Sequence, residues 1–245
     1  MRRGAGSPKL FMTPAYAFEL CDLVFSWKKH TPVTLDIPSL SLPLGNSLFI
    51  HGASGSGKST LLNILSGVLV AQQGDVMLLN QPFSAVSNRK RDQIRSDHLG
   101  YIFQQFNLLP YLSVLENVLL PIKISAVRRR GHSRHSKTLV DEAKHWLTQL
   151  KVPESLFEEK ISRLSVGQQQ RVAAARALIG SPEIIIADEP TSSLDQKNVD
   201  NFMAVLVEQC SSIGSSLVFV SHDLNLLPYF DASFALQTSP LGNDL

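Results

Sequence analysis

The chain has 245 residues, of which 44% are hydrophobic and 18% charged, and its formal net charge is +2. This length fits one large domain with a proper core, and general disorder is excluded because it needs low hydrophobicity and high net charge. The small charge also argues against a dedicated nucleic-acid binder. No apolar run reaches the roughly 18 residues of a membrane-spanning helix. The basic start Met1–Pro8 has no apolar stretch behind it, so we expect a protein of the cytosol.

Short apolar stretches predict strands, and apolar residues at helical spacing predict helices. Residues 1–14 are rich in Gly, Ser, Pro and basic side chains and are expected to be a disordered N-terminal extension, followed by a single domain over residues 15–245. The expected strands are Ala15–Phe25, Ser47–Ile50, Val76–Leu79, Leu99–Phe103, Glu183–Ala187 and Ser216–Val220. The expected helices are Lys58–Val68, Asn88–Asp97, Gly167–Ile179 and Gln196–Ile213, and Asn80–Pro82 is expected to be a turn.

The middle of the chain has a different character. Between Gln105 and Arg163 the apolar spacing is helical and no strand pattern is convincing. We therefore expect a helical subdomain, over about 105–170, inserted into an α/β core. Fully apolar strands such as Ile184–Ile186 belong in the middle of a parallel sheet, where both faces are covered.

Two further expectations concern exposure. The cysteines, Cys21 and Cys210, fit neither a disulfide framework nor a zinc pattern, and both are expected to be buried. The basic run Arg128–Lys137 is expected to be a solvated loop between helices. Contact of this run with anionic lipid head groups is the second interpretation.

A phosphate-binding loop is predicted at Gly52–Thr60, which fits G-x-x-x-x-G-K-[ST] between an apolar strand and an amphipathic helix. Glycines let the backbone N–H groups point at phosphate oxygens, and the helix N-terminus adds partial positive charge. Lys58 is expected to bridge the β- and γ-phosphates, and Ser59 to bind Mg²⁺. The expected nucleotide-binding residues of this loop are Gly52, Ser54, Gly55, Ser56, Gly57, Lys58, Ser59 and Thr60.

Two carboxylates, Asp188 and Glu189, end the apolar strand that begins at Glu183. Asp188 can reach the Mg²⁺ shell, and Glu189 can orient or deprotonate an attacking water. Adjacent residues of a strand face opposite ways, so the two carboxylates should have different roles. The alternative is a strand that runs into an acidic turn, which is common by itself. A complete phosphate loop in the same chain makes this interpretation of the two carboxylates disfavoured.

An ordered set of motifs then gives a resemblance to the ATP-binding cassette of ABC transporters, from about residue 17 to 236. The set comprises the phosphate loop, the Q-loop glutamine Gln104, the signature Leu164–Gln168, the Walker B pair Asp188–Glu189, the D-loop Ser193–Asp195 and the switch histidine His222. The resemblance implies an α/β fold: a P-loop NTPase core with a mostly parallel sheet, an antiparallel β subdomain near the N-terminus and an inserted α-helical subdomain.

The resemblance also implies the residue roles. Signature residues of one cassette face the γ-phosphate held by a partner cassette, so that two ATP molecules are sandwiched between two copies. On this side the implied residues are Ser165, Gly167, Gln168 and Asp195. Gln104 is implied as a contact of Mg²⁺ and water, and His222 as a contact of the γ-phosphate and water. Trp27 aligns with the aromatic residue that stacks on adenine, with core packing as the alternative.

The signature departs from the usual form, because Val166 stands where glycine is usual. A β-branched residue tolerates positive φ poorly, so Val166 must avoid it. Ser165, Gly167 and Gln168 remain, and we expect the anion contact to survive.

The runs Phe103–Pro110 and Leu115–Pro121 resemble the branch that contains the lipoprotein-releasing, macrolide-exporting and cell-division cassettes. The resemblance implies an ATPase subunit that powers a separate integral membrane permease of export or extraction type, with ATP and Mg²⁺ as cofactors. It implies a second, identical cassette as partner, no nucleic acid, and a peripheral position at the cytoplasmic face of the inner (plasma) membrane through the permease. The alternative is a regulatory or force-transmitting cassette without transport. A soluble cassette acting on DNA or ribosomes is third, since it usually needs a long coiled-coil insertion or two fused cassettes.

Overall fold

The computed structural model describes residues 16–28, 33–130, 138–192 and 194–237. The expected N-terminal extension lies outside the described residues. The strands are β1 (Tyr16–Phe25), β2 (Leu35–Pro43), β3 (Ser47–His51), β4 (Gln73–Leu78), β5 (Gln81–Pro82), β6 (Leu99–Ile102), β7 (Ile184–Asp188), β8 (Ser216–Val220) and β9 (Ala232–Ala235). The α-helices are α1 (Lys58–Leu65), α2 (Asn88–His98), α3 (Val114–Ile124), α4 (Ala126–Arg130), α5 (Leu139–Gln149), α6 (Val166–Leu178) and α7 (Gln196–Ser212). Short 3₁₀ turns lie at Glu154–Leu156, Ile161–Arg163 and Leu224–Tyr229.

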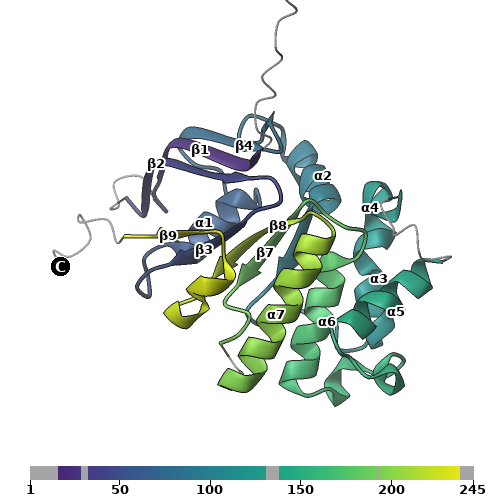
Figure 1. Ribbon diagram of the computed structural model, residues 1–245. Coiled ribbons are helices and arrows are strands. Elements are labelled where there is room, and N and C mark those ends of the chain that lie inside the picture. Colours follow the sequence, from purple (N-terminus) through teal and green to yellow (C-terminus); the bar gives the residue numbers. More distant parts are fainter. Residues whose placement is uncertain (1–15, 29–32, 131–137, 193, 238–245) are drawn as a thin grey trace, which may run out of the picture.

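A parallel sheet with strand order β6-β7-β8-β3-β9 forms the centre of the molecule (Figure 1). Its middle strands are covered on both faces. In β7, Ile184 and Ile186 pack in the hydrophobic cluster that contains α1, while Ile185 and Ala187 pack in the cluster that contains α3, α5, α6 and α7. The alternation is the period of two expected for a strand. The α/β fold with a mostly parallel sheet is thus confirmed.

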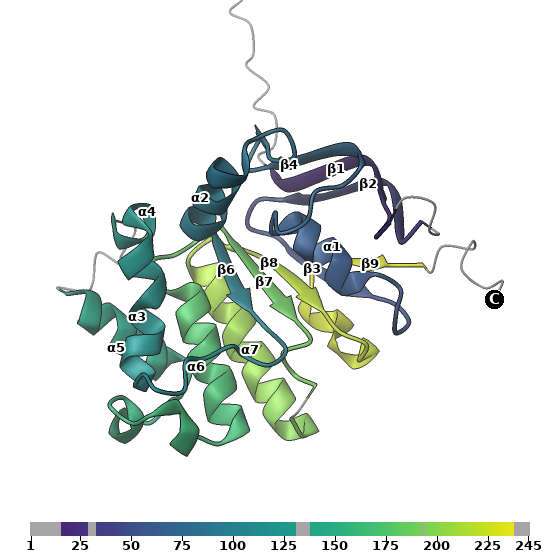
Figure 2. The ribbon, with the colours of Figure 1, turned by 180° about the vertical axis from the view of Figure 1, so that it is seen from behind.

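A second, antiparallel sheet with order β2-β1-β4-β5 lies beside the first, and helix α1 is enclosed between the two sheets (Figures 1 and 2). The sequence analysis missed β2, which contains Pro38. Proline donates no ladder hydrogen bond, and it is accepted here because β2 is the sheet edge. The expected turn at Asn80–Pro82 is present but begins one residue earlier: Leu79 and Asn80, with φ of 48° and 59°, form the tip of a hairpin in which β5 pairs with β4. The edge strand β9 of the parallel sheet was also missed.

In the described part of the stretch from residue 105 to 170, the regular elements are α-helices and 3₁₀ turns, apart from an isolated bridge between Ser113 and Lys160. Side chains at helical spacing in and after α5 form its core: Ala143, Trp146, Leu147 and Leu150 are buried. Helix α6 lies beside α7 on the face of the parallel sheet opposite to α1 (Figure 1), and it contacts β6 and α3. The N-terminus of α6 therefore lies away from the sheet while its C-terminus packs on β6.

Two expectations about exposure are wrong in part. Cys210 is buried, but Cys21 is exposed. Arg128 is not in a solvated loop: it belongs to α4, it is only 4% exposed, and its guanidinium donates to the carbonyl oxygens of Ala177, Ile179 and Leu99. These bonds compensate the cost of burying a charged group. The rest of the basic run, residues 131–137, lies outside the described residues.

Candidate functional site

A cleft of about 470 Å³ opens at the carboxyl ends of β3, β7 and β8. In an open parallel α/β sheet this edge is where ligands bind. The cleft is lined by Trp27, Thr34, Ser54, Gly55, Gly57, Lys58, Ser59, Thr60, Gln104, Glu189 and His222. The structure thus brings together most of the residues that were expected to hold a nucleotide or to catalyse its hydrolysis. Thr34 was missed, because it carries no motif and enters the cleft only through the fold of the antiparallel sheet.

The loop before α1 has the backbone of a phosphate cradle. Gly55 and Gly57 have φ of 79° and 97°, a region that side chains disfavour, and Gly57 is the N-cap of α1. At Gly57 a Cβ atom would also lie 2.7 Å from Cδ2 of Leu35. At Gly52 a Cβ atom would overlap the carbonyl oxygen of Leu236. Glycine at these places is therefore required by the chain itself.

The side chains of the loop are those of an anion site. Lys58 Nζ donates to the carbonyl oxygens of Gly52 and Ala53, at 2.9 and 3.0 Å, and so lies over the loop. Ser56 is only 2% exposed, and its Oγ atom has no hydrogen-bond partner. A buried hydroxyl without a partner is costly. Ser56 is not among the residues that line the cleft, so the fit of the loop to a phosphate group rests on its glycine backbone and on Lys58.

Asp188 lies at the end of β7 and hydrogen-bonds the side chain of Ser59. Burial and the neighbouring charge of Glu189 raise the pKa of the Asp188 carboxyl, while the bond with Ser59 and the charge of Lys58 oppose the rise. A carboxylate and a hydroxyl are hard oxygen ligands, which suit Mg²⁺. Among the described residues no group of three or more His, Cys, Asp or Glu side chains could hold a metal, so a Mg²⁺ ion here would also need oxygens of the nucleotide and water.

Glu189 and His222 form a contact at the mouth of the cleft. Nδ1 of His222 lies 2.9 Å from Oε2 of Glu189. The Glu189 side chain is 15% exposed and that of His222 71%. A carboxylate and an imidazole placed together can hold and orient a water molecule and take up a proton.

Trp27 stands at the outer side of the cleft. Its side chain is 59% exposed and touches the edge of Phe25 with a centroid separation of 5.3 Å. The alternative that Trp27 is a core residue is disfavoured by this exposure. An indole face that is open to a phosphate cleft can stack on a nucleotide base.

The predicted signature residues lie elsewhere. A separate cavity of about 450 Å³ is lined by Lys151, Pro153, Ser165, Val166, Gly167, Gln168, Arg171, Leu194, Asp195 and Asn198. It shares no lining residue with the first cleft. Lys151, Pro153, Arg171 and Asn198 were not predicted to lie here, whereas Leu194 belongs to the expected D-loop Ser193–Asp195. Within the described chain, the phosphate loop and the signature residues therefore do not meet.

The signature cavity contains the N-terminus of α6. Ser165 is its N-cap, and it exchanges hydrogen bonds with Gln168 in a capping box. Val166 is the first helical residue, is 49% exposed and has no positive φ, as expected. A Cβ atom at Gly167 would meet only Cδ2 of Leu194, at 3.8 Å. Nothing in the described chain therefore requires glycine at 167. Its missing side chain leaves the N-terminus of α6 open to close approach by another molecule.

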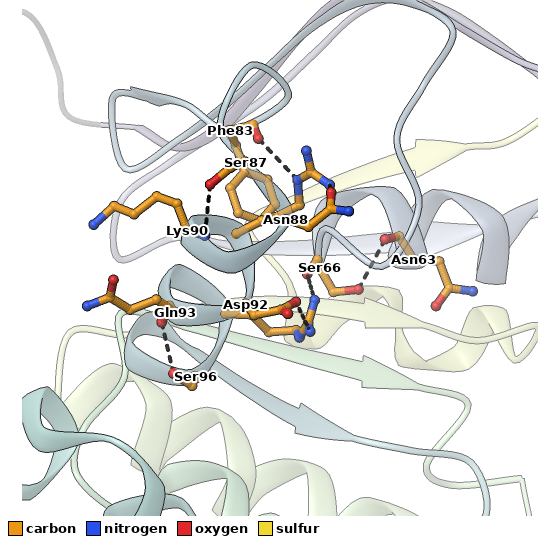
Figure 3. Close-up of polar contacts among 11 residues, drawn as sticks. Asn63, Ser66, Phe83, Ser87, Asn88, Lys90, Asp92, Gln93 and Ser96 are labelled. Carbon is orange, nitrogen blue, oxygen red and sulfur yellow. Dashed lines mark hydrogen bonds and ion pairs between the residues drawn. The ribbon is translucent and has the colours of Figure 1, made fainter.

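The far end of α1 is anchored to α2 (Figure 3). Arg95 donates to the carbonyl oxygen of Ser66, the C-cap of α1, and to Asp92. The buried Arg91 donates to the carbonyl oxygens of Phe83 and Val86. Helix α2 leads directly into β6. The contacts of α2 therefore fix α1, the phosphate-loop helix, relative to the strand that precedes Gln104.

Comparison with known proteins agrees with this geometry. The ABC transporter family model matches residues 35–192. The lipoprotein-releasing system ATP-binding protein LolD of Saccharophagus degradans is 34% identical over 205 residues, covering 83% of this chain and 86% of that protein. The uncharacterized ABC transporter ATP-binding protein YbbA of Escherichia coli is 39% identical over 197 residues, covering 80% and 83%. The dimeric post-hydrolysis structure of the ATP-binding cassette MJ0796 bound to ADP and Pi has a TM-score of 0.79 at 32% identity, covering 92% of this chain and 96% of that one.

The chain belongs to the ABC transporter family, and it is an ATP-binding cassette with ATPase activity. No helix of the described residues has the length and apolar character needed to cross a membrane.

Proposed function

We propose that this protein is the ATP-hydrolysing subunit of a transporter, that it dimerises around two ATP molecules, and that it powers a separate membrane permease of export or extraction type. The observation that carries the proposal is the presence of two half-sites on one chain: a phosphate-loop cleft and a signature cavity with no lining residue in common. Each half lacks what the other provides, so two chains related by a two-fold axis can complete both sites.

The first half-site binds the nucleotide in this proposal. The adenine stacks on Trp27, and the loop residues Gly52–Thr60 hold the phosphates. The loop offers backbone N–H groups at the N-terminus of α1 and the Lys58 ammonium. Ser59, Asp188 and Gln104 are the proposed Mg²⁺ contacts. Asp188 and Gln104 can contact the ion directly or through a water molecule. When bound, Mg²⁺ supplies charge neutralisation of the phosphates.

Hydrolysis is assigned to the mouth of the same cleft. Glu189 is the proposed general base that takes a proton from the attacking water, and Gln104 orients that water. His222 holds the Glu189 carboxylate and contacts the γ-phosphate. Its 2.9 Å contact with Glu189 supports this assignment.

The second half-site is proposed to close over the ATP of the partner chain. Ser165, Gly167, Gln168 and the helix N-terminus of α6 supply donors to the γ-phosphate. Asp195, the N-cap of α7, lies in the same cavity and belongs to the dimer contact. The related cassette MJ0796 is dimeric in two structures, which supports a paired arrangement.

The proposed membrane partner is supported by the similarity to lipoprotein-releasing system ATP-binding proteins. Proteins named as ATP-binding subunits of a lipoprotein-releasing system cover most of this chain, which supports a peripheral place at the cytoplasmic face of a membrane. The cell-division-like alternative, a force-transmitting cassette without transport, uses the same catalytic residues. Pull-down of the tagged chain from detergent-solubilised membranes separates the two by the architecture of the membrane protein recovered.

Complementation between variants tests the two-chain site. In a Lys58→Ala chain the phosphate-loop half is lost, and in a Ser165→Arg chain the signature half is blocked. Each variant alone should be inactive. A mixed dimer contains one intact composite site, so random mixing should restore about a quarter of the wild-type ATPase rate. If the mixture stays as inactive as its components, the two halves do not complete each other across chains.

A further inference from the structure

The two ends of helix α6 face different functional elements. The N-terminal end carries the signature residues, and the C-terminal end carries Arg176, in its last turn. The Arg176 guanidinium donates to two consecutive carbonyl oxygens, that of Phe106 at 2.6 Å and that of Asn107 at 2.7 Å. Burial lowers the pKa of Arg176 to about 10, so the guanidinium stays charged at neutral pH.

The two carbonyl groups belong to an unusual turn that contains Gln104. Phe106 and Asn107 have φ of 59° and 47°, both in the left-handed region. Asparagine tolerates this region, whereas an aromatic residue adopts it only where its surroundings impose it. The turn is closed by hydrogen bonds from the Phe106 N–H to Phe103 O and from the Asn107 N–H to Gln105 O. Gln104 lies inside this turn, and its side chain lines the nucleotide cleft.

A second contact fixes the chain just beyond the turn. The buried side chain of Asn117 accepts a hydrogen bond from the Leu109 N–H at 2.8 Å and donates to the carbonyl oxygens of Leu109 and Ser113. Upstream, Ile102 is fixed by its pairing with β7. Between these two anchors, Arg176 makes the side-chain contacts that hold the left-handed pair.

We propose that Arg176 is a positioning residue for hydrolysis: by gripping the carbonyl groups of Phe106 and Asn107 it fixes the turn that aims Gln104 into the nucleotide cleft. Because Arg176 and the signature residues share one helix, the position of Gln104 also depends on α6. The inference rests on the proposed function, since it concerns a residue assigned there to Mg²⁺ and water. A guanidinium is suited to this place because its rigid fork bonds two oxygens at once, which a lysine ammonium does not reproduce.

Arg128 provides a matched control. Its buried guanidinium also donates to backbone carbonyl groups at the C-terminal end of α6, those of Ala177 and Ile179, and burial lowers its pKa to about 10 as well. Its side-chain hydrogen bonds go to Leu99, Ala177 and Ile179, and none goes to the turn at residues 103–107. Loss of Arg128 should therefore lower stability without moving Gln104.

The test compares Arg176→Gln, Arg176→Lys and Arg128→Gln in the full chain. The first should lower kcat by roughly 10- to 100-fold, as a displaced catalytic group does, while the Kd of a fluorescent ATP analogue stays within about twofold because the phosphate loop is untouched. It should also raise the Mg²⁺ concentration needed for half-maximal activity. The lysine variant should lie between the wild type and Arg176→Gln. Arg128→Gln should lower the Tm, with kcat per folded molecule unchanged; Arg128→Lys replaces it if the glutamine variant does not fold.

A double-mutant cycle decides whether Arg176 acts through Gln104. In a Gln104→Ala background, Arg176→Gln should cause little further loss of kcat, because the positioned group is already gone. Fully additive losses, or a kcat of Arg176→Gln equal to that of the wild type, would overturn the proposal. So would parallel losses of Tm, kcat and nucleotide affinity that match those of Arg128→Gln.

Hydrogen exchange separates failure of the inference from failure of the proposed function. Backbone amides of residues 104–109 should exchange faster in Arg176→Gln than in the wild type. In Arg128→Gln the exchange rates of these amides should equal those of the wild type. A wild-type chain without any ATPase activity would contradict the proposed function. The exchange comparison would still show whether Arg176 holds the turn that contains Gln104.

Discussion

Nδ1 of His222 and Oε2 of Glu189 are 2.9 Å apart, although 33 residues separate them in the chain. The two residues follow neighbouring parallel strands, β7 and β8, at the same edge of the sheet. Glu189 has a left-handed backbone with φ of 47°, and its N–H donates to the carbonyl oxygen of Val220. This backbone conformation is costly outside glycine, and here it turns the carboxylate toward His222 and the nucleotide cleft.

Glu189→Gln is expected to retain ATP binding and to lose roughly 10²- to 10⁴-fold in kcat, the range of general-base catalysis. The amide keeps the size of the side chain but cannot take up a proton. An ATP-dependent dimer should accumulate, measured by light scattering after gel filtration. Glu208→Gln, on the exposed side of α7, is the control and should behave like the wild type. Hydrolysis at the native rate in Glu189→Gln would rule out Glu189 as the base.

Lys58→Ala is expected to lose nucleotide binding itself. The Nζ atom lies over the phosphate loop through bonds to Gly52 and Ala53, and its charge is the main cation of the cleft. Equilibrium binding of a fluorescent ATP analogue measures the loss, and Lys123→Ala on α3 serves as the control. Unchanged affinity in Lys58→Ala would place the phosphates elsewhere.

Trp27→Ala should weaken ATP binding by roughly 1–3 kcal/mol, the range for stacking of a base on an aromatic side chain. Folding should be little affected, because the indole is 59% exposed. The sequence has only one other tryptophan, Trp146, and it is buried at 2% exposure. Quenching of intrinsic fluorescence by ATP should therefore persist in Trp146→Phe and vanish in Trp27→Phe; the opposite pattern would exclude stacking on Trp27.

A pH-dependent contribution to stability is expected from His98, at the end of α2. The hydrogen bond from its Nδ1 to Glu183, 3.0 Å long, raises the pKa of the imidazole above its ordinary value of 6.5 in spite of partial burial. The charged pair stabilises the fold fully below about pH 6.5, and this contribution is lost as the pH rises through the raised pKa. For a partly exposed pair it should be about 1 kcal/mol or less.

Thermal unfolding of the wild type and of His98→Gln from pH 5 to pH 9 measures this contribution. The Tm difference between the two proteins should shrink as the pH increases. A difference that grows with pH would mean that the neutral imidazole is the form stabilised by folding.

Local sequence determined the parts of the site that depend on neighbouring residues. The phosphate loop could be predicted because glycine conformations, a lysine and a hydroxyl within nine positions create the anion cradle by themselves. The strand ending in Asp188 and Glu189 could be predicted because its apolar run requires a covered sheet and its end must reach the ligand edge. Likewise Val166 was expected to avoid positive φ, and it does, as the first residue of α6.

Contacts between distant segments were decided only by the tertiary structure. Strand β2 was missed because Pro38 weakens its pattern, and pairing with β1 stabilises it nonetheless. Arg128 was expected in a solvated loop, yet the fold directs its guanidinium, like that of Arg176, to backbone carbonyl groups. The family resemblance implied that the signature residues face a partner's phosphate loop, and the fold then gave the two cavities of one chain no lining residue in common. The physical reason is the same throughout. Backbone preferences depend on adjacent residues and can be predicted from the local sequence. Burial, charge pairing and contacts between loops depend on distant segments that only packing brings together.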